Sequence, residues 1–102
     1  MEIKYKKQSD NLTVFIYGEL DECNASHVKD ILDKLIMDNC NSRKVIFDLS
    51  GISFMDSTGV GLLIGRYKKL KSFSVPSYIS GASVATEKVL QLAGLYNIMP
   101  KI

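Results

Sequence analysis

Hydrophobic positions follow two different periods along the first part of the chain. The stretches "EIKYKK" and "LTVFIYG" alternate apolar with polar residues, or carry β-branched and aromatic ones, and so predict two strands. The turn-forming cluster "QSDN" joins them, so the fold is expected to open with a β-hairpin. The next segment has helical spacing and predicts a helix with Asn24 as its N-cap. The apolar stripe that should face a core consists of Val28, Ile31, Leu32, Leu35 and Ile36.

The middle of the chain predicts a buried strand, a second helix and a weaker strand. "RKVIFDLS" indicates a short strand, and its consecutive apolar residues at 45–47 are typical of a sheet covered on both faces. A loop over residues 50–58 should lead into a helix from about Thr58 to Lys71. "VPSYIS" predicts an edge strand or a strand start, because Pro76 has no N–H to donate to a ladder.

The last part of the chain continues the alternation of helices and strands. "GASVATEKVLQLAG" predicts a third helix with Ser83 as cap and Gly94 as its stop, and "YNIMPKI" predicts one last strand. This order implies a single α/β domain over residues 1–102. Its sheet should be mixed and mostly parallel, with an N-terminal hairpin and helices packed on it.

The helix at 58–71 has an apolar face and an opposite face of mixed character. At about 100° per residue, Val60, Leu63, Ile64 and Tyr67 share the first face, and Thr58, Leu62, Gly65 and Lys69 share the second. Leu62 is therefore expected to be exposed. Glycines at 61 and 65 each cost the helix about 1 kcal/mol relative to alanine. Such a cost is tolerable where another backbone, from this chain or from a partner, must approach closely.

Three side chains able to cap a helix crowd its start. Only one of Asp56, Ser57 and Thr58 can be the N-cap, which is worth about 1 kcal/mol. Ser57 is a candidate for this structural role. If another residue caps the helix, the hydroxyl is left exposed at the positive end of the helix dipole, where an anion is tolerated.

Composition and charge narrow the function classes. The share of hydrophobic residues is 46%, but no apolar run is long enough to span a bilayer. The start "MEIKYKKQSD" lacks the apolar region of a signal peptide, so a cytoplasmic location is expected. The net charge is +2, and the one basic cluster consists of Arg66, Lys68, Lys69 and Lys71. These residues close a helix, which favours a solvated, dipole-matched helix end over nucleic-acid binding.

Other chemistries require patterns that the chain lacks. Cys23 and Cys40 have no metal-ligand spacing and His27 has no second ligand nearby, so reduced thiols and no metal site are expected. A P-loop needs a lysine directly after its last glycine. Neither Gly51 nor Gly59 is followed by a lysine, so a P-loop is excluded. The spacing of the glycines at 59, 61 and 65 is similar to the glycine pattern of dinucleotide-binding proteins. However, a predicted loop separates these glycines from the preceding strand, and no acidic residue ends the following strand, so dinucleotide binding is not expected. A serine nucleophile would need the glycines of a G-x-S-x-G turn and a nearby histidine. The glycines are missing and His27 lies on a different predicted helix, so hydrolysis is not expected.

The segments with these features resemble one known family. "GELDECNASHV" followed by "VIFDLSGISFMDSTGVGLLIGRYKKLK" is similar to the STAS domain of bacterial anti-sigma factor antagonists, and "MDSTGVGLLIGRYK" is most similar to the sporulation type. The similarity runs from about Ile3 to Ile102. The pairing of the GELD loop with the D-S-[ST]-G helix start makes it specific. The resemblance implies a STAS fold and a regulator with no catalysis and no cofactor of its own.

The resemblance also implies partners and a phosphorylation site. In this family, an anti-sigma factor that is itself an ATP-dependent serine kinase phosphorylates the serine of D-S-[ST]-G. The unphosphorylated antagonist binds that kinase and frees the sigma factor, and a dedicated serine phosphatase resets the serine. By position, the phosphoacceptor is Ser57, flanked by Asp56, Thr58 and Gly59. Asp21 of "GELD" matches a carboxylate that meets a basic residue of the kinase, and a turn or helix-start role is the alternative for it.

Physical chemistry is consistent with such a switch. A phosphate adds about −1.5 to −2 charges, which a helix start tolerates, whereas misplaced like charges in an interface cost several kcal/mol. Gly61 and Leu62 are expected to form the apolar, closely approached part of that interface. Any ATP or ADP would be bound on the kinase. No direct contact with nucleic acid or membrane is expected.

Two departures from the family pattern leave alternatives open. "SFSVPSYIS" is shorter than the family's glycine-containing turn, and the chain stops at Ile102, where the family usually adds a final helix. Either the protein is a trimmed member of the family, or that face of the sheet is covered differently, for example by a second copy in a homodimer. A STAS-type scaffold or a nucleotide-responsive domain without a phosphoswitch is the alternative function. A third, enzymatic alternative rests only on the closeness of Asp21, Cys23 and His27 in sequence.

Overall fold

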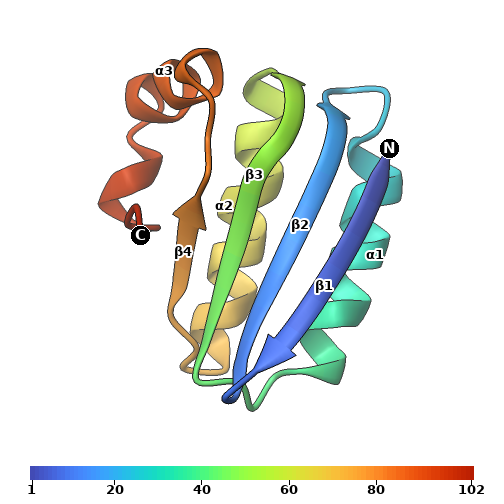
Figure 1. Ribbon diagram of the computed structural model, residues 1–102, viewed down its shortest axis with the longest axis vertical. Coiled ribbons are helices and arrows are strands. Elements are labelled where there is room, and N and C mark those ends of the chain that lie inside the picture. Colours follow the sequence, from blue (N-terminus) through green and yellow to red (C-terminus); the bar gives the residue numbers. More distant parts are fainter.

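Four strands form one sheet in the order β1-β2-β3-β4, and the computed structural model describes residues 1–102 (Figure 1). The hairpin pair β1 and β2 is antiparallel, and β3 and β4 are parallel to β2. The strands are β1 Glu2–Gln8, β2 Asn11–Leu20, β3 Lys44–Met55 and β4 Ser77–Ser80. The helices are α1 Ala25–Asp38, α2 Ser57–Ser72, α3 Val84–Leu92 and the short 3-10 helix η1 Leu95–Asn97. The expected α/β fold with a mixed sheet and an N-terminal hairpin is confirmed. None of the helices combines the length and apolarity needed to cross a membrane.

The hairpin turn has the backbone that a two-residue connection requires. Ser9 and Asp10 have φ values of 52° and 65°, and Gln8 pairs with Asn11 on either side of them. Positive φ at both central positions is the geometry of a type I′ turn, whose twist matches that of the flanking strands. The hairpin predicted from "QSDN" is therefore confirmed.

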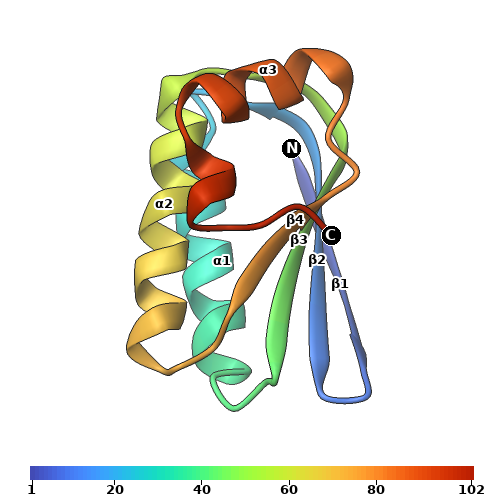
Figure 2. The same cartoon turned by 90° about the vertical axis from the view of Figure 1, so that its left-hand side faces the viewer.

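α1 and α2 lie on the same face of the sheet, and they do not cover the other face (Figure 2). Along β3, Val45 and Phe47 are buried, whereas Ile46 between them is only partly buried. The prediction of a strand covered on both faces was wrong. Ile46 lies on the open face, between Thr13 of β2 and Tyr78 of β4 in the register. A β-branched residue fits that half-exposed position well, so its hydrophobicity does not indicate two-sided burial.

β3 also continues through the segment that the sequence assigned to a loop. It stays paired with β2 as far as Met55, with register shifts that absorb its extra length. Gly51 permits this, because any side chain there would collide with the ring of Tyr17. Only Asp56 separates the strand from α2. The sequence argument that placed the glycine-rich helix start far from its strand was therefore wrong.

The predicted ends of the helices are mostly confirmed. Asn24 is the N-cap residue of α1, but its side chain donates to the carbonyl oxygen of Glu19 (2.9 Å) instead of capping the helix. Ser83 does cap α3, since its Oγ accepts the N–H of Thr86 at 3.2 Å. Gly94 follows that helix with φ 71°, the left-handed conformation expected of a helix stop.

The C-terminal segment does not form the predicted last strand. After η1 it makes a single parallel bridge, in which Ile79 pairs with Lys101. Pro100 can accept a bond from Ile79 but has no N–H to extend the ladder. β4 itself is a four-residue strand that begins just after Pro76, in line with the expected strand start.

α1 and α2 are joined by a cluster of charged side chains. Asp33 of α1 contacts Lys29 Nζ at 3.1 Å, Arg66 Nε at 3.2 Å and Lys69 Nζ at 3.5 Å. Arg66 is only 8% exposed, so the expectation that the whole basic cluster is solvated was wrong for this residue. Burial alone would raise the pKa of Asp33, but the hydrogen bond from Lys29 and the charges of Arg66 and Lys69 together lower it.

We predict that Asp33→Asn lowers the free energy of unfolding at pH 7 by about 1–2 kcal/mol, because it leaves Arg66 buried without its counter-charge. The folded-state pKa of Asp33 lies below its unfolded value of about 3.9, so the stabilisation is full above that value and disappears as the pH falls through the folded-state pKa. Urea denaturation should show a constant gap between wild type and variant above about pH 5, and a closing gap below about pH 4. The exposed Asp30→Asn on the same helix is the matched control. An equal effect in both variants would contradict the assignment.

Candidate functional site

The carboxyl ends of β2 and β3 bring two distant segments together. Leu20 and Met55, the last residues of these strands, are register partners, and the N–H of Asp56 donates to the carbonyl oxygen of Leu20 at 3.4 Å. The segment called here the GELD loop, residues 18–24, consists of the last three residues of β2 and the connection to α1, and it lies beside the start of α2. Both segments are at the upper end of the molecule in Figure 1, and α3 lies at that end too.

Asp56 is the N-cap of α2. Its Oδ1 accepts the N–H groups of Thr58 (2.9 Å) and Gly59 (3.1 Å), while its Oδ2 accepts the N–H of Glu22 in the GELD loop (3.3 Å). One carboxylate thus starts the helix and holds the loop against it. This settles which of the three crowded side chains is the cap, and Ser57 becomes the first residue of the helix.

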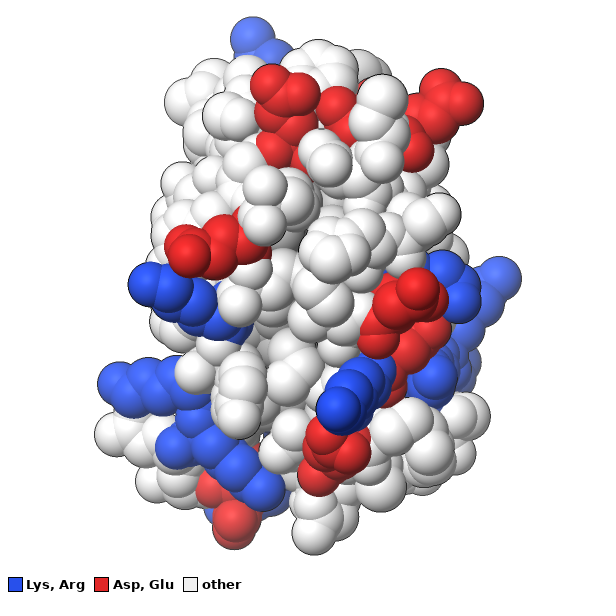
Figure 3. Space-filling model, turned by 90° about the vertical axis from the view of Figure 1, so that its right-hand side faces the viewer, with Lys and Arg blue, Asp and Glu red and all other residues white.

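Asp21 shows the local role that the sequence offered as its alternative. Its Oδ1 accepts the N–H of Asn24 at 3.1 Å, and its backbone oxygen accepts the N–H of Ala25 at 2.9 Å, so it shapes the entry into α1. The side chain remains partly exposed. Acidic side chains gather at this end of the molecule, as Figure 3 shows from the side of β1 and α1. The GELD loop contributes Glu19, Asp21 and Glu22.

The residues that follow the cap differ sharply in what they can contact. Ser57 and Thr58 are exposed. Gly59 is buried, and a Cβ there would lie 2.5 Å from the carbonyl oxygen of Leu20, so only glycine fits. Gly61 has no atom within 4 Å of where its Cβ would be. The close approach of a backbone inside this chain thus explains Gly59 and leaves Gly61 facing open space.

Leu62 does not belong to an exposed surface, so the expectation that its side chain is exposed was wrong. It is 8% exposed and part of the hydrophobic core. Leu62 lies one turn before Arg66, and Arg66 reaches Asp33 of α1, so this flank of α2 faces α1. The sequence prediction assumed that only the sheet covers α2, whereas α1 covers a second flank.

The exposed apolar surface lies instead between α2 and α3. A hollow of about 410 Å³, called here the α2–α3 groove, is lined mostly by apolar residues and has Ser57 at one end. Its lining consists of Ser57, Val60, Gly61, Ile64, Val89, Leu92 and Ala93. Leu92 is 90% exposed and Val84 at the start of α3 is 73% exposed. A hydroxyl group, an acidic loop and an apolar groove thus adjoin one another, which suits recognition of a protein surface.

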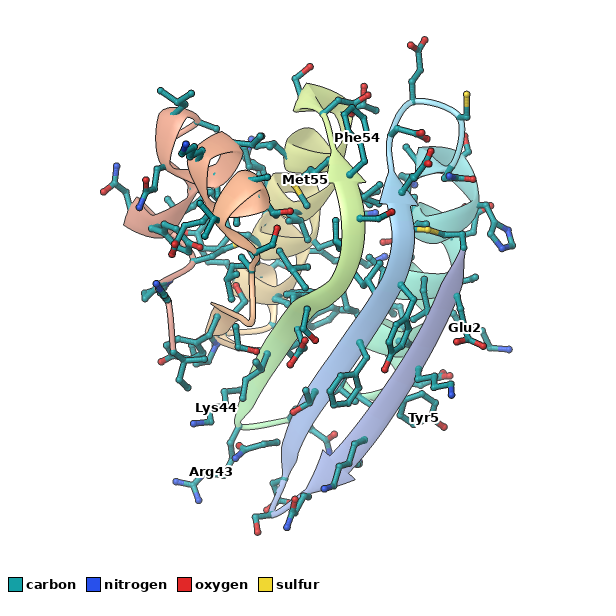
Figure 4. The ribbon with its side chains drawn as sticks, turned by 45° about the horizontal axis from the view of Figure 1, so that its top comes forward. Glu2, Tyr5, Arg43, Lys44, Phe54 and Met55 are labelled. Carbon is teal, nitrogen blue, oxygen red and sulfur yellow. The ribbon has the colours of Figure 1, made fainter.

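Two exposed apolar residues, Leu92 and Phe54, could have been found from the sequence. Leu92 lies about 200° around the helix from Leu90, which is fully buried, so it must point to solvent. Phe54 precedes the buried Met55 on β3, and alternation along a strand puts it on the other side (Figure 4). Phe54 is 53% exposed near the end of the strand. Both signals were available from periodicity once the neighbouring residue was assigned to the core.

A family model described as "STAS domain" matches residues 2–102 of the chain. The chain is 29% identical over 99 residues to an anti-sigma-B factor antagonist of Listeria monocytogenes, covering 97% of this chain and 84% of that protein. It is 30% identical over 86 residues to an anti-sigma F factor antagonist of Lysinibacillus sphaericus, covering 84% of this chain and 73% of that protein.

Solved structures share the fold. The anti-sigma factor antagonist SpoIIAA in its unphosphorylated form matches with a TM-score of 0.80 at 24% identity, covering 99% of this chain and 88% of that chain. The Bacillus cell fate determinant SpoIIAA in its phosphorylated form matches with a TM-score of 0.71 at 24% identity, covering 99% and 91%. The N-terminal hairpin, the parallel strands and the helices on one face are therefore an arrangement that other proteins adopt.

We predict that Asp56→Ala lowers the free energy of unfolding by about 1–2 kcal/mol, because α2 loses its cap and the GELD loop loses its anchor. Ser57→Ala should change it by less than about 0.5 kcal/mol, since the Ser57 side chain is exposed and is not the cap. Urea denaturation of the two variants measures both values. A larger loss in Ser57→Ala than in Asp56→Ala would show that the cap is misassigned.

Proposed function

Because the chain belongs to the STAS domain family, we propose that it is an anti-sigma factor antagonist. In this proposal its unphosphorylated form binds an anti-sigma factor that is also a serine kinase, and the bound sigma factor is released. Phosphorylation of Ser57 ends the binding, and a phosphatase restores it. The protein itself performs no catalysis. Two similar proteins, at 29% and 30% identity, carry the name of anti-sigma factor antagonist.

The observation that carries the proposal is the position of Ser57. It is exposed at the first turn of a 16-residue helix, and Asp56 already provides the cap. A kinase could therefore reach the hydroxyl without disrupting the helix start. A phosphate there would sit at the positive end of the helix dipole, so the fold should tolerate its charge. Solved structures of SpoIIAA, which shares the fold, exist in unphosphorylated and phosphorylated forms.

The surroundings of Ser57 explain how the same phosphate would prevent docking. The carboxylate of Asp56 is the neighbouring residue, and the acidic GELD loop lies beside it. Once a partner covers this surface, water no longer screens the added charge of about −2, and repulsion between like charges costs several kcal/mol. Since each 1.4 kcal/mol is tenfold in affinity, one phosphate can lower binding by two or more orders of magnitude.

In this proposal the apolar contact with the partner is made by the α2–α3 groove, and not by Leu62 as the sequence had suggested. Gly61 lines the groove and leaves it open, because it has no side chain. Leu92 lines it as an exposed apolar side chain. In the proposed complex, the partner buries this groove while Asp21 at the edge of the acidic loop meets a basic side chain. Thr58 and Gly59 complete the surface at the helix start.

We predict that the chain gains one phosphate when it is incubated with ATP and an anti-sigma factor kinase encoded in the same genome, and that Ser57→Ala gains none. The physical reason is that Ser57 is the exposed hydroxyl whose backbone position the Asp56 cap fixes. Intact-mass spectrometry counts the phosphates and peptide mapping places them. Thr58→Val is the matched control and should still be modified. A phosphate retained by Ser57→Ala would overturn the site assignment.

Leu92→Asp should weaken binding of the unphosphorylated chain to the same anti-sigma factor by at least tenfold, because it puts a charge in the α2–α3 groove. Met37 on α1 is also an exposed apolar residue but lies outside the groove, so Met37→Asp is the control and should bind as wild type does. Calorimetric titration measures both affinities. Equal binding by wild type and Leu92→Asp would remove the groove from the interface.

A further inference from the structure

A second hollow lies at the other end of α2 from Ser57. Its volume is about 330 Å³, within the range of small-molecule sites. Tyr67 and Lys71 of α2 form one wall, residues 74–78 form the second, and Ile98 and Pro100 of the C-terminal segment form the third. In Figure 2, which faces this edge of the sheet, the C-terminal segment runs from η1 to β4 above the last turns of α2.

One buried polar group in the wall of this hollow has no hydrogen-bond partner in the chain. Ser77 is 3% exposed, and its Oγ makes no hydrogen bond. Ser77 alternates with Tyr78 along β4 and shares the core-facing side with Ile79, so its hydroxyl points toward α2. A buried hydroxyl without a hydrogen bond is unfavourable, and such groups usually have a partner that completes them. The position of Ser77 in the wall of the hollow indicates where that partner would be.

The other lining residues define the chemistry of an occupant. Lys71 supplies a positive charge, and its Nζ lies 5.8 Å from the centre of the Tyr67 ring without an acidic partner. The remaining surface is mostly apolar, with Val75, Ile98 and Pro100 among its residues. A cation and a buried hydroxyl beside apolar and aromatic walls match a molecule with an apolar body and one anionic end.

We propose that this hollow is a binding site for a small amphipathic carboxylate. Lys71 pairs with the carboxylate, Ser77 donates a hydrogen bond to it, and the apolar body packs against the tyrosine ring and the C-terminal segment. Positions 57 and 71 are separated by 14 residues of α2, about 21 Å along its axis. The site is therefore distinct from the surface around Ser57, and its occupation would not compete directly with a partner there.

The test uses 3-phenylpropionate as the probe and the neutral 3-phenylpropionamide for comparison. Amide shifts of the ¹⁵N-labelled full chain are followed during titration with each. We expect saturable shifts at Tyr67, Lys71 and residues 74–78 with a dissociation constant on the order of 1–10 mM for the acid. The amide should bind at least about tenfold more weakly, because it cannot pair with the lysine. Absence of shifts at these residues, or equal binding of acid and amide, would overturn the proposal.

Two variants test whether Lys71 and Ser77 bind the carboxylate. Lys71→Met should weaken binding of the acid by about tenfold or more, and Ser77→Ala by about threefold to tenfold. Ser77→Ala removes no hydrogen bond within the chain, so it should fold like wild type. Lys68→Met, which changes an exposed lysine on the same helix but outside the hollow, is the control and should leave binding unchanged. Wild-type affinity in both Lys71→Met and Ser77→Ala would show that the hollow does not hold the carboxylate.

Discussion

The carboxylate of Asp56 accepts three backbone N–H groups, two from the first turn of α2 and one from the GELD loop, 34 residues earlier in the chain. The rest of the candidate surface depends on this arrangement. Because the cap is provided by the residue before it, the hydroxyl of Ser57 is not needed for the fold. Because the same carboxylate anchors the loop, the acidic residues stay next to that hydroxyl. Position 56 is thus structural, and this structural role leaves position 57 available for chemistry.

α2 has three different surroundings, and each explains a part of its sequence. Its apolar stripe, represented by Leu63 and Leu70, packs into the core. A second flank with Leu62 and Arg66 faces α1, where Asp33 neutralises the buried arginine. Only the flank at Gly61 is open, toward α3. A helix that is covered on two sides has little surface left for a partner, and here that remaining surface includes the exposed serine.

Much of the fold followed from local patterns, and the misses on α2 and on the length of β3 share one cause. The hairpin turn, the α1 stripe and the cap of α3 depend on residues close in sequence, and periodicity and capping preferences predict them. The burial of Leu62 and Arg66, by contrast, depends on α1 packing beside α2, which a helical wheel cannot show. The same holds for the length of β3, whose last residues are strand only because β2 extends beside them. For the candidate site, the sequence pointed to the helix start and the GELD loop, which lie side by side in the structure, but it wrongly expected Leu62 to be exposed.

The unbroken course of α2 has a mechanical consequence. Sixteen residues in a regular helix behave as a rod, with the serine at one end and the lysine-lined hollow at the other. Local rearrangement at one end would be absorbed within a turn, so communication between the ends would require the whole rod to slide or tilt. The ion pairs to Asp33 lie between these ends and would act as the pivot of such a movement.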